Sequence, residues 1–115
     1  MIAATLGVAA FGQDASSRPD YRRDAGATRV LVERAVSIKA GDAKVGVLEK
    51  LGIPDQDVVL VRKERPEVIG RSLTWNIVKW KRGLVNELQD EYVDVFLDPQ
   101  DIVKTVTIRA KLTRQ

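Results

Sequence analysis

The chain has 115 residues, of which 44% are hydrophobic and 30% charged, and its 19 basic and 16 acidic side chains leave a net charge of +3. This length and apolar content predict one small globular domain with a single modest core. Neither cysteine nor histidine occurs, which excludes disulfides, thiol chemistry, imidazole acid–base catalysis and the common zinc sites.

Residues 1–12 (MIAATLGVAAFG) form an apolar stretch rich in small side chains. Crossing a bilayer takes about 20 residues, so no transmembrane span is expected here. Ala10 and Gly12 stand three and one positions before a potential cut, as small residues do at a secretory cleavage site. We interpret the stretch as a secretory leader without the usual positive start, which predicts an exported protein. A disordered leader or a short buried strand is the alternative interpretation.

Residues 13–27 carry Ser, Pro, Asp, Arg and Gly and few apolar side chains, a composition typical of a flexible leader. A single domain is therefore expected over 28–115. Within it, residues 28–38 fit two patterns. Val30 and Val32 alternate as in a strand, whereas Leu31 and Ala35 recur at helical spacing. An arginine would fall on the apolar side of that strand, which favours the helix.

Residues 43–51 carry the clearest helix signal. Asp42, directly after Gly41, suits an N-cap, because its carboxylate can accept from the first free amides. Gly52 stands where a left-handed residue ends a helix, and Pro54 blocks its continuation. The expected apolar face consists of Val45, Leu48 and Leu51.

Strands are expected in the C-terminal half. Residues 57–61 are mostly β-branched and suit a short strand, and the charges of 62–71 predict a polar connection. Period-two alternation predicts strands over 72–81, 91–97 and 102–112. The predicted architecture is α+β, with two short N-terminal helices packed on a three-stranded antiparallel sheet in the order ααβββ.

Residues 38–54 (IKAGDAKVGVLEKLGIP) combine a Gly-Asp step, a valine four residues on and a closing Leu-Gly-Ile-Pro. This segment resembles the BamE/SmpA/OmlA family of small bacterial envelope proteins. The likeness continues at Trp75, in residues 92–97 and at Ile102, which are similar to the family's three strands. The resemblance implies a two-helix, three-strand fold and a role in outer-membrane assembly or envelope integrity through protein contacts.

Three features of the chain depart from this family. It has no cysteine after the apolar stretch, whereas the family's assembly factors are lipoproteins. The connection from Pro54 to Trp75 is longer, and the turn before Ile102 lacks the family's glycine. A soluble periplasmic relative is therefore expected. Beta-lactamase-inhibitor proteins are built from similar helix–sheet units, so an inhibitor role is the alternative.

Strand alternation predicts a binding face on the sheet. If Leu73, Trp75 and Ile77 point into the core, the residues between and after them point outward. Aromatic side chains gathered on an open face are typical of an interaction site. The alternatives are that the N-terminal segment or 57–61 covers this face, or that the two faces are exchanged. The predicted binding face consists of Val78, Trp80, Tyr92 and Phe96, with Lys81 and Arg82 as its polar rim.

The sequence does not predict an enzyme. Carboxylates are plentiful, but a short meander has no cleft in which two of them could act together. No phosphate-binding loop, nucleophile motif or metal-ligand spacing occurs, so neither a cofactor nor a metal is expected. Basic residues are interspersed with acidic ones, which argues against nucleic acid as the partner.

The expected function is that of a non-catalytic protein-interaction domain of the cell envelope. An inhibitor-type or small-ligand-binding periplasmic protein that uses the same sheet face is the alternative. A homodimer through that face is a third outcome.

Overall fold

The computed structural model describes residues 18–62, 64, 67–81 and 87–111. The predicted leader over 1–12, residues 13–17 and Arg82 of the predicted rim lie outside these residues. In chain order the elements are β1 (Tyr21–Arg22), α2 (Ala25–Val36), α3 (Lys44–Leu51), β2 (Gln56–Val61), β3 (Val68–Lys79), β4 (Glu91–Leu97) and β5 (Val103–Arg109).

Over the described residues, the strands form one five-stranded antiparallel sheet. β3, β4 and β5 make the predicted meander, whereas β1 and β2 both pair with the other edge of β3. The α+β class is confirmed. The three-stranded sheet and the ααβββ order are not matched, because β1 precedes the helices and β2 joins the sheet after them.

β2 and β3 form a hairpin that is longer than the sequence predicts. The charges of 62–71 predict a polar connection, yet β3 begins at Val68, and Val61 lies opposite that residue. Backbone pairing at the end of a two-stranded arm needs no apolar face, because both faces meet solvent. The strand therefore continues beyond the point where apolar alternation stops.

The prediction of a flexible leader is wrong for residues 21–27, which form β1 and the first turn of α2. Asp24 is the N-cap of α2, and its Oδ2 accepts from an amide of the first turn at 3.0 Å. Such a cap satisfies one of the amides that have no partner inside the helix. The helical interpretation of 28–38 is confirmed, with Leu31 and Ala35 buried in the core.

α3 begins one residue later than predicted, and Asp42 does not cap it. The carboxylate of Asp42 accepts from the amide of Lys39 at 2.9 Å, and the N-cap is Ala43, whose side chain makes no capping bond. Gly41, with a φ of 100°, turns the chain into an extended segment that pairs with the start of β5. There the amide of Val103 donates to the carbonyl oxygen of Asp42 at 2.8 Å. This pairing delays the helix.

The end of α3 is as predicted, and its buried side is predicted in part, since Leu48 and Leu51 pack against the core. Gly52 has a φ of 83°, its amide donates to the carbonyl oxygen of Leu48 at 2.8 Å, and Pro54 follows. Val45, expected on the apolar face, is 67% exposed, and Val47 is buried in its place. The rotation of this short helix about its own axis depends on how the preceding segment, residues 41–43, is anchored to β5. The spacing of apolar residues within the helix does not reveal that anchoring.

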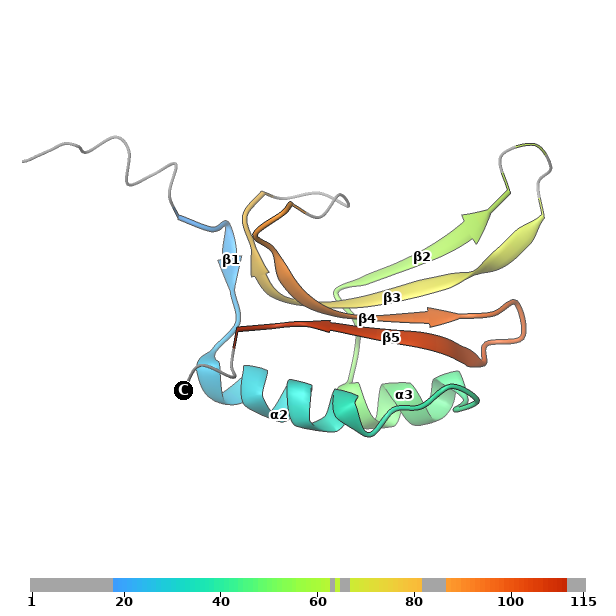
Figure 1. Ribbon diagram of the computed structural model, residues 1–115, viewed down its shortest axis with the longest axis horizontal. Coiled ribbons are helices and arrows are strands. Elements are labelled where there is room, and N and C mark those ends of the chain that lie inside the picture. Colours follow the sequence, from blue (N-terminus) through green and yellow to red (C-terminus); the bar gives the residue numbers. More distant parts are fainter. Residues whose placement is uncertain (1–17, 63, 65–66, 82–86, 112–115) are drawn as a thin grey trace, which may run out of the picture.

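Both helices lie on one side of the sheet, and the end of the β2–β3 hairpin reaches away from them (Figure 1). Trp75 is 1% exposed, as its predicted core position requires, and its indole Nε1 has no hydrogen-bond partner among the described residues. The core between helices and sheet consists of Leu31, Ala35, Ile38, Val47, Leu73, Trp75, Ile77, Val78, Val93, Val95, Leu97 and Val103.

Candidate functional site

A β-bulge near the end of β3 divides the predicted binding face between the two sides of the sheet. Asn76 lies opposite Tyr92, but Val78 lies opposite Glu91, so β3 has one extra residue at this point. An extra residue reverses the alternation of side chains beyond it. Val78 is therefore only 4% exposed, and Trp80 packs against the core.

The prediction that Val78 and Trp80 share a face with Tyr92 and Phe96 is thus wrong. The sequence carries a signal for the bulge, since Ile77 and Val78 are adjacent apolar residues that interrupt the alternation. Lys81 of the predicted rim is exposed beyond the end of β3.

The same bulge is followed by a buried ion pair. Lys79 and Asp90 are 4% and 1% exposed, and Nζ lies 3.5 Å from Oδ2. Asp90 also accepts from the amides of Trp80 at 2.8 Å and Glu87 at 2.7 Å. A buried carboxylate with these partners ties the end of β3 to the start of β4. Its role is structural, and no spacing in the sequence indicates it.

Tyr92 and Phe96 remain together on the face of the sheet that points away from the helices. We call this side the open face, because no helix covers it in the described part of the chain (Figure 1). Both rings are half-buried, and Asp94 lies between them on the same side of β4. These three residues, Tyr92, Asp94 and Phe96, form what we call the β4 stripe.

Two hydroxyl groups of β3 orient the carboxylate of Asp94. Ser72 Oγ and Thr74 Oγ1 both donate to Oδ1 of Asp94 at 2.8 Å. Thr74 and Thr107 lie directly opposite Asp94 on the two neighbouring strands. Because two charge-assisted hydrogen bonds fix the carboxylate, it presents a rigid negative group at the middle of the open face.

The ring of Phe96 covers a glycine of β3. Gly70 has a φ of 157°, and a Cβ built on it would lie 2.7 Å from two ring atoms of Phe96 and would also meet the carbonyl oxygen of Leu97. Only glycine allows this close approach. Phe96 therefore has a packing role at one end of the β4 stripe.

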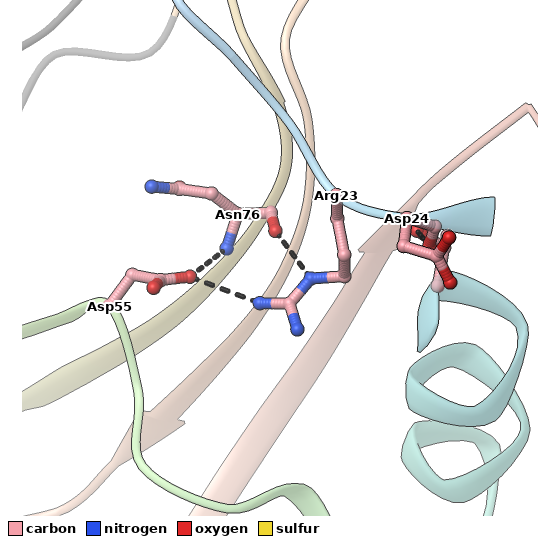
Figure 2. Close-up of polar contacts among 5 residues, drawn as sticks. Arg23, Asp24, Asp55 and Asn76 are labelled. Carbon is pink, nitrogen blue, oxygen red and sulfur yellow. Dashed lines mark hydrogen bonds and ion pairs between the residues drawn. The ribbon is translucent and has the colours of Figure 1, made fainter. Parts of the chain in front are cut away.

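A polar junction joins β1 to β2 along the edge of β3. Figure 2 shows Arg23 Nε donating to the carbonyl oxygen of Asn76 at 2.8 Å, while Asp55 Oδ2 accepts from the amide of Asn76 at 2.7 Å. Arg23 Nη2 lies 3.2 Å from the same Oδ2. β1 and β2 pair with different parts of the same edge of β3, and Asn76 lies between these two parts. The side chains of Arg23 and Asp55 therefore bond the backbone carbonyl oxygen and amide of Asn76 in place of a paired strand. This cluster is therefore structural.

A hollow of about 320 Å³ lies beside this junction, next to the start of α2. Its lining combines basic side chains with buried apolar ones of β3. The lining residues are Arg22, Arg23, Ala25, Thr28, Ile77, Val78, Glu91 and Lys111.

Within the ranges that the structure describes, no group of three or more acidic side chains is arranged to hold a metal ion. No helix in those ranges has the length and apolar character needed to cross a membrane. Chemically, the open face offers two aromatic rings, an oriented carboxylate and several hydroxyl groups, which suit binding.

Comparison with known proteins returns no match to any family model, curated protein or solved structure. The resemblance of residues 38–54 to the BamE/SmpA/OmlA family therefore stays a prediction, and the function is argued from the geometry.

Proposed function

We propose that this chain is a non-catalytic protein-binding domain of the cell envelope and that a partner docks on its open face. One observation supports this most directly: Tyr92 and Phe96 lie half-exposed on a sheet face that no described helix covers. Aromatic side chains bring a large contact area with few torsions to immobilise, and they are common anchors of protein interfaces.

The chemistry of the β4 stripe suggests what the partner carries. Its two rings flank the carboxylate of Asp94, which two hydroxyl groups already orient. A partner that places apolar side chains on the rings and a hydrogen-bond donor or a basic group between them would match this order. The match extends along a strand, which suits a protein surface better than a compact small molecule.

The assignment to the cell envelope rests on the sequence. It is supported by the apolar, small-residue stretch at 1–12 and by the family resemblance of residues 38–54. A role in outer-membrane assembly or envelope integrity belongs to the same proposal.

The test uses the two tyrosines of the chain. Tyr92 lies on the open face, and Tyr21, on β1, is 41% exposed and serves as the matched control. The full chain, Tyr92→Ala and Tyr21→Ala are used to retain proteins from bacterial envelope extracts, and each retained protein is then purified and titrated. We expect a partner whose Kd rises about tenfold or more with Tyr92→Ala and is unchanged with Tyr21→Ala. Finding no partner that depends on Tyr92 would contradict the proposal.

The alternative, a small-ligand binder, is favoured by the hollow beside α2. Three basic residues and one acidic residue, Glu91, line it together with Ile77 and Val78. This excess of positive charge beside apolar side chains suits a small anion with an apolar part. Titration with a short-chain carboxylate such as decanoate, followed by tryptophan fluorescence, tests it. Saturable binding that Arg22→Ala abolishes and Tyr92→Ala leaves intact would favour this alternative.

A further inference from the structure

Asp94 carries a negative charge at the centre of the β4 stripe, and only one of its two carboxylate oxygens is occupied. Ser72 Oγ and Thr74 Oγ1 both donate to Oδ1 at 2.8 Å. Oδ2 makes no hydrogen bond with any residue that the structure describes. The two hydroxyl groups therefore orient the carboxylate and leave one oxygen available to another molecule.

Within the described ranges, no basic side chain neutralises the charge of Asp94. Arg109 lies opposite Tyr92 on β5, but its Nη2 donates to the carbonyl oxygen of Leu88. The ion pairs found in these ranges join other acids to their bases, namely Arg23 to Asp55, Arg62 to Glu67, Arg71 to Asp57 and Lys79 to Asp90. Since hydroxyl donors are neutral, the charge of Asp94 is uncompensated.

The surroundings of Asp94 favour a cation. The side chain is half-buried, and it faces the uncharged Thr74 and Thr107 on the two neighbouring strands. A charge that is partly removed from water is screened less than one in bulk solvent. The rings of Tyr92 and Phe96 stand two residues away on either side, and aromatic faces also attract cations. The centre of the open face is therefore suited to a positively charged group.

The occupied oxygen of Asp94 decides which cation fits. A carboxylate oxygen has two lone pairs, and the two hydroxyl groups use both of those on Oδ1. Arginine binds a carboxylate most strongly through a fork of two parallel bonds, one to each oxygen. A lysine ammonium is a compact charge that needs only one oxygen, and its methylene stem can lie along a neighbouring ring. The arrangement therefore favours lysine over arginine.

We infer that the protein partner of the open face places a lysine ammonium on Oδ2 of Asp94 and an apolar side chain on each ring of the β4 stripe. This inference rests on the proposed function and names the chemistry of the partner. Every second side chain of an extended strand lies on the same face. An extended partner segment therefore matches the stripe when its lysine is separated by one residue from an apolar residue on each side.

The experiment titrates the isotope-labelled full chain with short peptides and follows the backbone amides of β4 by NMR. The probe is acetyl-Leu-Thr-Lys-Thr-Leu-amide, and two matched peptides carry Gln or Arg in place of Lys. We expect the lysine peptide to bind with a Kd about threefold or more below that of the glutamine peptide, and below that of the arginine peptide. Added NaCl should weaken the lysine peptide, because salt screens the ion pair.

Asp94→Asn removes the charge and keeps an acceptor oxygen for the two hydroxyl groups. This variant should bind the lysine peptide about threefold or more weakly and the glutamine peptide as before. Glu49→Gln is the matched control, since it removes one negative charge from an exposed position of α3, on the other side of the sheet (Figure 1). It should leave the Kd of the lysine peptide unchanged. The three peptides test the unmodified chain as well, so a folding defect in Asp94→Asn does not spoil the experiment.

Equal affinities of the lysine and glutamine peptides, or no binding of either, would overturn the inference. So would tighter binding of the arginine peptide, or an equal loss of affinity with Glu49→Gln. The proposed function fails in a different way, through the absence of any envelope partner that depends on Tyr92. A purified partner that depends on Tyr92 but binds Asp94→Asn with an unchanged Kd would refute the lysine alone and leave the proposed function standing.

Discussion

The two halves of β3 lie in opposite environments, although they belong to one continuous strand. From Leu73 to Lys79 every residue except Asn76 is buried, whereas Val68 and Ile69 are exposed. The first half of the strand extends beyond the helices (Figure 1), and its first residues pair with β2 alone. Apolar side chains of the second half belong to the core.

This difference places the side chains that stabilise the fold in one half of the strand. Both halves pair with neighbouring strands, but the apolar side chains of the second half are removed from water and those of the first half are not. Substitutions in the second half should therefore lower the free energy of unfolding, and those in the first half should change it little.

The largest effect is expected at the centre of the buried half. Trp75→Ala should lower the free energy of unfolding by about 4 kcal/mol, because it removes a large side chain and leaves a cavity. Val68→Ala, in the exposed half, should lower it by no more than about 0.5 kcal/mol. Urea denaturation followed by circular dichroism measures both, and similar losses at the two positions would refute the separation.

The buried ion pair at the end of the strand comes next. Asp90→Asn leaves one acceptor oxygen where Asp90 offers one to each amide of Trp80 and Glu87, and it removes the negative charge beside Lys79 Nζ, so the free energy of unfolding should fall by about 3 kcal/mol. Adding Lys79→Met removes the buried ammonium group and should recover the part of the loss that comes from its charge. Equal stabilities of the single and double variants, in the same denaturation experiment, would show that the charge is not the cause.

Gly70 lies where the exposed half of β3 meets the buried half. Gly70→Ala should cost about 2 kcal/mol, because a φ of 157° disfavours alanine and the new methyl group would meet the ring of Phe96. Gly46→Ala is the control, since no atom lies within 4 Å of its Cβ position in α3, and it should stabilise the protein by about 0.5 kcal/mol. Equal free energies of unfolding for Gly70→Ala and Gly46→Ala would show that Gly70 is not required where the two halves of β3 meet.

The smallest effect is expected where side chains replace a strand. Asp55→Ala removes the acceptor of the Asn76 amide and should cost about 1 kcal/mol. Asp57→Ala breaks only an exposed ion pair with Arg71 and should cost less. Hydrogen exchange should quicken at β1 in the first variant alone, and unchanged exchange there would mean that Asp55 does not hold β1 in place.

Local signals in the sequence were sufficient for several elements. Gly52 and Pro54 mark the end of α3 through properties of the residues themselves. Glycine readily adopts a positive φ, and proline has no amide hydrogen to continue the helix. The turn over 98–101 is likewise held by local contacts, with Asp98 Oδ1 accepting from the amides of Gln100 and Ile102. Alternation likewise located the three strands of the meander and placed Trp75 in the core.

Contacts between distant segments decided the rest. The side chain of Asp42 is suited to an N-cap. Because residues 41–43 pair with the start of β5, its carboxylate instead accepts from the backbone amide of Lys39. The bulge after Asn76 moves Val78 and Trp80 into the core and leaves Tyr92 and Phe96 on the open face. Alternation with a period of two predicts which face a side chain lies on only while the strand keeps its register. Register is set by pairing with the neighbouring strand, and the sequence of one strand alone does not contain that information.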